Sequence, residues 1–299
     1  MRRFSWIGTS KLWISLSALL TLLTIVSLFT QGLNFSIDFL GGTRFAIRFE
    51  ETKSVPEVRQ ALEALSYPGA TVQQSTDQTG EFFIVTPPLT DEERLQLQEG
   101  LEKELGAFEL RSVDSVSPVI GSELRLAALW AIGLATLGMW LYILFRFEWR
   151  FAVAAIIALT HDVVLTIGLF SALQLPVDTS FVAAVLTIYG YSINDTIIIF
   201  DRIRENLRNR RKQSLAELVD QSIRQTLARS INTSATTLLA IGSVYLLGGP
   251  TLRPLSLALI VGIIVGAYSS IFLASPLYVW LAEGKIGGRH QVGATAKTS

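Results

Sequence analysis

Residues Phe181–Phe200 read FVAAVLTIYGYSINDTIIIF. This stretch is long and apolar enough to cross a membrane as one helix, because roughly 20 mostly apolar residues span the hydrocarbon core. It nevertheless contains a carboxylic acid, Asp195. A charged side chain inside a membrane span is energetically costly and marks a candidate functional position. The stretch therefore predicts a membrane protein and also a place where its activity resides.

Five further apolar runs flank this one. They are Leu12–Phe29, Leu126–Phe145, Phe151–Leu173, Ile231–Leu247 and Leu255–Leu281. The first run is long for the apolar core of a cleaved signal peptide and no A-x-A site follows it, so we expect a retained anchor. In the last run small residues recur every four positions and predict close helix packing: Ala258, Gly262, Gly266 and Ser270. The sequence thus predicts an α-helical polytopic membrane protein with six transmembrane helices.

The composition agrees with that class. Of the 299 residues, 50% are hydrophobic and 17% are charged, whereas a soluble globular chain usually carries about a quarter charged residues. The absence of cysteine excludes disulfides, thiolate metal sites and a cysteine nucleophile. No G-x-x-x-x-G-K-[ST] loop is present, so ATP hydrolysis is not expected. We expect no metal, no cofactor and no enzymatic activity.

Basic residues predict the orientation through the positive-inside rule. They precede the first span, join spans two and three, fill residues 201–229 and follow the sixth span. Residues 201–229 alone carry eight Lys or Arg against four acids. With six spans these segments share one side, which we assign to the cytoplasm together with both termini. Residues 32–123 carry seven basic and sixteen acidic residues and are expected on the opposite side.

Residues 32–123 predict an inserted α+β ferredoxin-like extracytoplasmic domain. Phe45–Phe49 alternates as a half-buried strand, and capping boxes at Ser54 and Thr90 begin two helices. A hairpin is expected around residues 76–80, and a last strand over Phe108–Val116. The order β-α-β-β-α-β is that of a split βαβ sandwich. Since no metal cluster, phosphate loop or nucleophile–base pair occurs here, we expect a binding or lever domain rather than an enzyme.

The basic segment 201–229 holds a third capping box at Ser214 and then apolar residues on one helical face. We expect a basic amphipathic connector lying on the inner membrane surface. A nucleic-acid site is the weaker alternative, because the positive-inside rule already explains the charge. The predicted layout begins with a cytoplasmic N-terminus and span one (1–31), followed by the domain (32–123) and spans two to four (124–200). The connector (201–229), spans five and six (230–282) and a cytoplasmic tail (283–299) complete it.

Ionisable residues within the spans are the candidate site. Asp162 lies near the middle of span three, while Asp195 and Arg229 fall at similar depths in spans four and five. A carboxyl group placed between burial and a neighbouring cation is suited to bind and release protons. A polar seam beside this pair is expected from Tyr191, Asn194, Ser230, Thr233, Ser234 and Thr237. The alternatives are a purely structural Asp195–Arg229 tether and an aspartyl protease, the latter disfavoured because no Gly-x-Gly-Asp motif is present.

Several of these segments resemble the SecD/SecF protein-export family. Residues 38–43, DFLGGT, follow the first span and resemble its D-x-x-G-G-T signature. GYSINDT at 190–196, continued by FDRIREN at 200–206, is similar to the family's span-four motif. HDV at 161–163 and TLARSINTS at 226–234 resemble two others, and the likeness covers nearly the whole chain.

The resemblance implies a proton-driven export accessory of the bacterial inner membrane, within the resistance–nodulation–division class. Its implied partners are SecD, the SecYEG channel, the SecA motor, unfolded exported polypeptides and membrane lipids, with no nucleic acid. The Asp and Arg of the family's proton route match Asp195 and Arg229. The family's span-three carboxylate aligns more loosely with Asp162. A joint between span and domain matches Asp38, Gly41 and Gly42. The alternative is a six-span half of a small-molecule or lipid permease of the same class.

Overall fold

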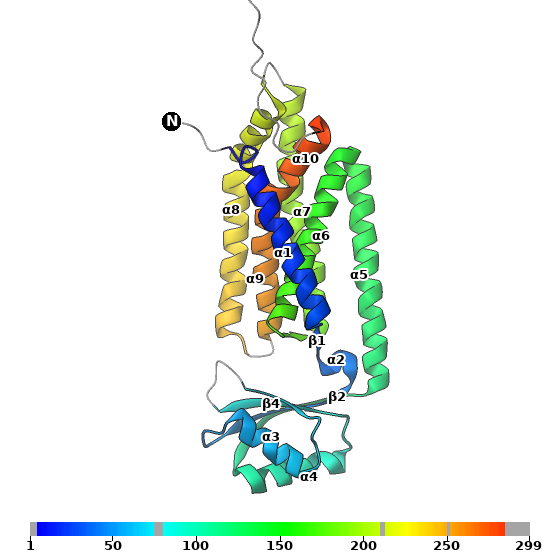
Figure 1. Cartoon of the computed structure of the whole chain (residues 1–299), viewed down its shortest axis with the longest axis vertical. Coiled ribbons are helices and arrows are strands. Elements are labelled where there is room, and N and C mark those ends of the chain that lie inside the picture. Colours follow the sequence, from blue (N-terminus) through cyan, green and yellow to red (C-terminus); the bar gives the residue numbers. More distant parts are fainter. Residues whose placement is uncertain (1–4, 75–79, 210–212, 250–251, 285–299) are drawn as a thin grey trace, which may run out of the picture. The chain divides into compact units, whose positions relative to one another are not determined.

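The computed structural model of the chain describes residues 5–74, 80–209, 213–249 and 252–284. In these ranges six helical segments are long and apolar enough to cross a membrane, which confirms the predicted number (Figure 1). They are α1 (Ser10–Thr30), α5 (Pro118–Arg146), α6 (Trp149–Ala172), α7 (Thr179–Arg208), α8 (Leu215–Leu247) and the composite segment Arg253–Glu283. This is a multi-pass membrane protein.

Two compact units make up the chain. We name the first the membrane unit, which comprises Met1–Asn34, Ile132–Leu175 and Ser180–Ser299. We name the second the domain unit, which comprises Phe35–Ala131 and Pro176–Thr179. The predicted end of the domain at residue 123 falls inside α5, because this helix begins at Pro118 and continues without a break into the second span.

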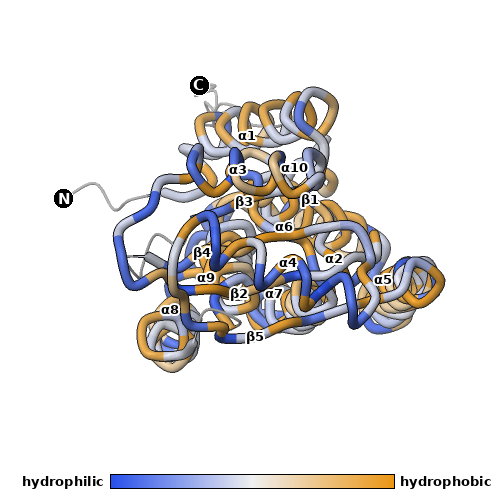
Figure 2. Tube along the Cα trace, turned by 90° about the horizontal axis from the view of Figure 1, so that it is seen from below, coloured by the Kyte–Doolittle hydropathy of each residue, from blue (hydrophilic) through white to orange (hydrophobic). Residues whose placement is uncertain are grey.

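The transmembrane segments differ in how deeply they are buried in the protein. In each segment we compare the share of its apolar 18-residue stretch that is buried inside the protein. This share is about half in α6 (56%), α7 (50%) and the sixth segment (50%), but only 6% in α5 and 11% in α8. Figure 2 shows hydrophobic residues along both of these exposed helices. The first three segments therefore form the interior of the membrane unit, while α5 and α8 present apolar surface to lipid or to another membrane protein.

Small residues in the sixth segment allow it to pack closely on α7, as their spacing predicts. A Cβ atom added at Gly262 would lie 2.2 Å from Ile188 Cδ1, and one added at Gly266 would lie 3.0 Å from Ser192 Cβ. The segment consists of α9 (Arg253–Ser269), a π-helical turn η2 (Ser270–Ala274) and α10 (Ser275–Glu283). The wide turn immediately precedes Pro276, which has no N–H to continue a regular helix.

The prediction of a separate connector helix on the membrane surface is wrong. The capping box at Ser214 is present, but the helix that it starts, α8, runs unbroken through Arg229 to Leu247. Its apolar residues Leu215, Leu218 and Val219 are buried in one hydrophobic cluster with Phe151 of α6, Phe200 of α7 and Leu277 of α10. An amphipathic pattern indicates an apolar neighbour without identifying it, and here the neighbour is protein rather than lipid.

The domain unit has the predicted order of elements. It contains β2 (Gly42–Phe49), α3 (Val55–Ala64), β3 (Thr71–Gln74), β4 (Glu81–Thr86), α4 (Asp91–Leu105) and β5 (Phe108–Val116). The sheet order is β3-β4-β2-β5 with antiparallel neighbours, so each helical connection skips one strand. Residues 75–79 of the expected hairpin turn lie outside the described residues.

The core of the domain unit lies between the sheet and its two helices. Phe45 and Phe82 from adjacent central strands are fully buried with Leu62 of α3 and Leu101 of α4. Alternation along β2 and the 3.6-residue period of the helices produce these two matching apolar faces.

Removing a helix cap should open α3 locally. Ser54 Oγ accepts a hydrogen bond from Glu57 N at 3.4 Å, while Ser54 N donates to Glu57 Oε2 at 2.7 Å. We expect Ser54→Ala to cost about 1 kcal/mol and to speed hydrogen exchange in α3. These bonds also hold the pKa of Glu57 below its ordinary value, first through the Ser54 hydroxyl and then through its backbone N–H.

The pH dependence of this effect follows from the lowered pKa of Glu57. A depressed folded-state pKa stabilises α3 above the unfolded-state value, and this stabilisation is lost as the pH falls through the folded-state pKa. The difference in exchange between wild type and Ser54→Ala should therefore shrink on acidification. Hydrogen-exchange mass spectrometry measures it, with Thr52→Ala in the preceding exposed turn as control; a difference independent of pH would contradict the assignment.

Candidate functional site

Asp162 of α6 lies where three helices of the membrane unit meet. Its Oδ2 atom accepts hydrogen bonds from Ser192 Oγ of α7 at 2.5 Å and from Ser269 Oγ of α9 at 2.7 Å. Its Oδ1 atom lies 3.2 Å from Nδ1 of the adjacent His161. The carboxyl group is fully buried. Buried polar groups need such partners. Asp162 is thus held inside the bundle by side chains of two other membrane-spanning segments, Ser192 of α7 and Ser269 of α9.

Asp195 lies on α7 three residues after Ser192, hence about one helical turn away. It is buried, and its Oδ2 atom accepts a long hydrogen bond of 3.5 Å from Ser234 Oγ of α8. Its Oδ1 atom has no partner among the described residues. The neighbouring Thr196 shares a 2.8 Å hydrogen bond with Ser270 of the π-helical turn. Asp195 is therefore held by fewer described contacts than Asp162.

Arg229 occupies an exposed position on α8, four residues before Thr233. It is near enough to Asp195 for their charges to interact. Within the described part of the chain, however, no ion pair joins the two side chains, so the tether proposed as a structural alternative is not observed there.

The predicted polar seam is only partly assembled. Tyr191 OH donates to Thr237 Oγ1 at 3.1 Å, which joins α7 to α8. Ser234 contacts Asp195, and the buried Ser230 lies one turn before it. Two members are not brought into the seam: Thr233 donates to the carbonyl oxygen of Arg229 in its own helix, and Asn194 is exposed.

Sequence reasoning missed the serines that hold Asp162. Ser192 lies within the predicted motif, and Ser269 adjoins the small-residue stripe, but serine in a helix often bonds only to its own backbone. Which serine faces which helix depends on the three-dimensional register of α7 and α9. Sequence spacing within single helices does not provide that register.

The glycine motif forms a tight corner in the domain unit. Gly41 and Gly42 have positive φ values of 76° and 141°. A Cβ atom at Gly41 would lie 2.8 Å from Pro118 Cα, and one at Gly42 would lie 2.7 Å from Thr86 O. Glycine is required here for both its backbone conformation and its small size.

Asp38, the acidic residue of the same motif, has a definite partner. Its Oδ2 atom accepts hydrogen bonds from Thr179 N at 3.0 Å and Thr179 Oγ1 at 2.7 Å, both within the domain unit. Asp38 therefore caps the first residue of α7, since carboxylates at a helix N-terminus satisfy its free N–H groups.

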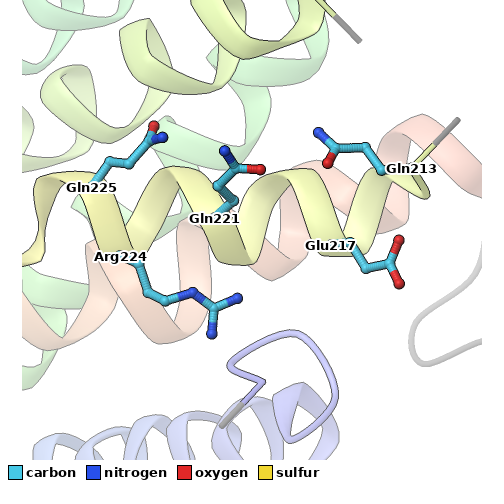
Figure 3. Close-up of a pocket in the computed structure, with 5 residues that line it drawn as sticks. All are labelled: Gln213, Glu217, Gln221, Arg224 and Gln225. Carbon is cyan, nitrogen blue, oxygen red and sulfur yellow. The ribbon is translucent and has the colours of Figure 1, made fainter. Parts of the chain in front are cut away.

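A separate pocket of about 520 Å³ lies along the first turns of α8. Its lining side chains project from several sides of the helix (Figure 3). They are Gln213, Glu217, Gln221, Arg224 and Gln225. None of them is among the partners described above for Asp162 and Asp195, so we treat the pocket as separate from the candidate site. In the described residues no group of three or more His, Cys, Asp or Glu is arranged to hold a metal ion.

Comparison with known proteins places these motifs in a family. The family described as protein export membrane protein SecD/SecF, C-terminal, matches residues 97–284, which include Asp162, Asp195 and Arg229. The SecD/SecF GG motif matches residues 26–53. The chain belongs to the SecD/SecF protein-export family.

Relatives within the SecD/SecF family are of two lengths. The chain is 41% identical to the protein translocase subunit SecF of Sebaldella termitidis, over 93% of this chain and 91% of that one. It is 40% identical to SecF of Haemophilus influenzae, over 88% and 82%. It is 45% identical to the protein translocase subunit SecDF of Thermus thermophilus, over 93% of this chain but only 38% of the relative.

A solved structure of the family has the same fold. The crystal structure of SecDF from Thermus thermophilus, a translocon-associated membrane protein, matches with a TM-score of 0.87 at 43% identity. The match covers 94% of this chain and 39% of that one. The chain thus spans about two fifths of the Thermus thermophilus SecDF and 82–91% of the two SecF relatives.

Proposed function

We propose that this chain is the SecF subunit of a bacterial protein translocase and a transport component rather than an enzyme. Near full-length similarity to SecF proteins supports this assignment. SecD is its direct partner, because the SecDF relatives carry a SecF-like portion within a longer chain that also bears the SecD name. In the bacterial inner membrane the pair assists the SecYEG channel and the SecA motor in moving unfolded polypeptides outward.

Proton flow drives this assistance through Asp195, Arg229 and Asp162. The observation that carries the proposal is the pair of buried carboxyl groups, Asp195 on α7 and Asp162 on α6, the latter bound to Ser192 of α7 about one helical turn before Asp195. Asp195 has one long hydrogen bond, and its Oδ1 atom has no partner among the described residues, so this carboxyl group can take up and release a proton. Protonation removes its charge, weakens its attraction to Arg229 and changes which hydroxyl groups it binds. The packing of α7 against α8 then differs between the two charge states.

The domain turns this change into movement of the exported chain. Asp38, Gly41 and Gly42 form the joint between span and domain, where positive φ angles permit a corner that other residues resist. The sequence of the domain contains no recognisable nucleophile–base motif, and we assign it a binding or lever role.

The test is co-purification. The tagged full chain, solubilised gently from its native membranes, should bring down a SecD-like protein in a stable ratio. Deletion of the gene should reduce export of secreted proteins. Efflux of small molecules that depends on this chain, with export unchanged on deletion, would instead favour the permease alternative.

The proposed orientation gives a labelling prediction. Because the chain has no cysteine, single cysteines report accessibility without background. Gly69→Cys, in the domain, should react with an impermeant maleimide added to intact spheroplasts. Gln221→Cys, exposed near the start of α8, should react only after the membrane is permeabilised. The reverse pattern would show that the positive-inside assignment is inverted.

A further inference from the structure

His161 is a buried histidine for which the route through Asp162 and Asp195 leaves no role. Only 8% of its surface is exposed. Its Nδ1 atom faces Asp162 Oδ1 at 3.2 Å, and its Nε2 atom is buried without a partner among the described residues. Histidine is the side chain whose charge ordinarily changes near neutral pH. A purely structural histidine would normally have both ring nitrogens satisfied.

The contacts of Asp162 identify which of its oxygens can take up a proton. Oδ2 already accepts two hydrogen bonds, from Ser192 and Ser269. Each hydroxyl occupies a lone pair of that oxygen. The proton of a neutral Asp162 is therefore carried by Oδ1, whose partner among the described residues is His161.

We propose that His161 and Asp162 act as a dyad that binds one transported proton, with entry at His161 Nε2 and delivery at Asp162 Oδ1. The inference rests on the proposed proton route. Before uptake the carboxylate is ionised and accepts the Nδ1 proton of neutral His161. A proton bound at Nε2 allows the Nδ1 proton to shift to Oδ1. The products are a neutral acid and a neutral imidazole protonated at Nε2, so one proton is gained and the dyad loses its negative charge.

Helix α1 carries hydroxyl groups at the level of His161. Helices α1 and α6 run side by side with a constant offset, since Gly168 packs on Thr24 and Ser171 shares a 2.9 Å hydrogen bond with Ser27. Seven residues earlier, two helical turns, the same offset brings Ser17 level with His161. Ser17 Oγ shares a 3.1 Å hydrogen bond with Tyr268 OH of α9. Hydroxyl groups of α1 and α9 therefore lie at the level of His161 along the bundle.

The other titratable groups around the dyad are few. Helix α7 contributes Asp195, α9 contributes Tyr268, and α10 contributes Tyr278, which stacks on Phe151. Helix α1 carries only Lys11, in its first turn. In the described part of the chain, His161 is the one potential cation in contact with Asp162. Any proton-dependent charge on the dyad is therefore shared between these two groups.

Infrared difference spectroscopy of the full chain in lipid vesicles tests the dyad. The carboxyl band that disappears in Asp162→Asn reports protonation of Asp162 as the pH is changed. His161→Gln, which can form hydrogen bonds but does not titrate, should displace the midpoint of this band by about one pH unit or more. The matched control is Thr166→Val, because Thr166 donates to the backbone oxygen of Asp162 and not to its carboxyl group. An unchanged midpoint in His161→Gln would overturn the proposal.

A second measurement leaves the dyad intact and applies even if His161→Gln fails to fold. The chain has only two histidines, His161 and His290. In a ¹⁵N-histidine-labelled His290→Gln protein, the ring signals of His161 should change with the same midpoint as the Asp162 band. A histidine that keeps one neutral tautomer while Asp162 titrates would overturn the dyad. If the dyad titrates as expected but Asp162→Asn still supports proton-dependent export, the dyad stands and the proposed route fails.

Discussion

Replacing Asp195 by Asn should abolish the proton-dependent stimulation of protein export while leaving the folded chain and its complex intact. Asparagine has nearly the same shape, and its amide oxygen can still accept the 3.5 Å hydrogen bond from Ser234. It does not bind or release a proton in this pH range. Transport of a secreted precursor into inverted membrane vesicles should therefore fall to the level seen when an uncoupler dissipates the proton gradient.

Two companion variants make this result specific. Arg229→Ala should cause the same loss, because the cation that acts on Asp195 is removed. Asn194→Ala is the matched control, since Asn194 precedes Asp195 on the same helix but is exposed. Full stimulation in Asp195→Asn vesicles would refute the proposed proton route. Loss of SecD from the purified complex would show instead that Asp195 acts in assembly.

Gly168→Val should strongly destabilise the membrane unit. A Cβ atom at Gly168 would lie 2.2 Å from Thr24 Oγ1 and 2.6 Å from Thr24 Cβ. Threonine is β-branched and rotates little in a helix, so α1 and α6 would have to separate. Overpacking of this kind typically costs about 1–3 kcal/mol. The temperature at which the detergent-solubilised chain loses its monodisperse peak in size-exclusion chromatography should fall by about 5–10 °C.

The same substitution on an open helix surface provides the control. Nothing lies within 4 Å of a Cβ atom at Gly138 of α5, so Gly138→Val should change this temperature little. Thr24→Gly combined with Gly168→Val should restore much of the loss, because it removes the clashing atoms. Equal losses at Gly138 and Gly168 would mean that β-branching, and not the α1–α6 contact, is responsible.

Local signals in the sequence were sufficient for much of the fold. Spans are set by the run of apolar residues, and helix starts such as Ser54 and Thr90 by a cap three residues before a glutamate. These features depend on neighbours along the chain, so a single sequence contains them. The same is true of the glycines at 41 and 42, whose pairing points to an unusual backbone.

Features that depend on contact between distant segments were not predictable in this way. The apolar face that begins at Leu215 looks the same whether it meets lipid or the side chains of Phe151 and Phe200. Asp162 and Asp195 were visible as charges in apolar runs, but the roles of Ser192 and Ser269 depend on how α6, α7 and α9 are rotated toward one another. That rotation is set by packing of whole helices.

Because α8 is continuous, the packing of one end sets the rotation of the whole helix about its axis. Leu215, Val219 and Ile223 are buried at the start of this 33-residue helix, and Ser230 and Ser234 are buried further along it. Because no break separates these groups, interlocking of the first turns sets the angular phase at which the serines point toward Asp195. Two residues inserted between them would turn the serines by about 200° without altering the hydropathy of the span. Packing of the apolar residues at the start of α8 thus sets the direction in which Ser230 and Ser234 point, several turns further along the helix.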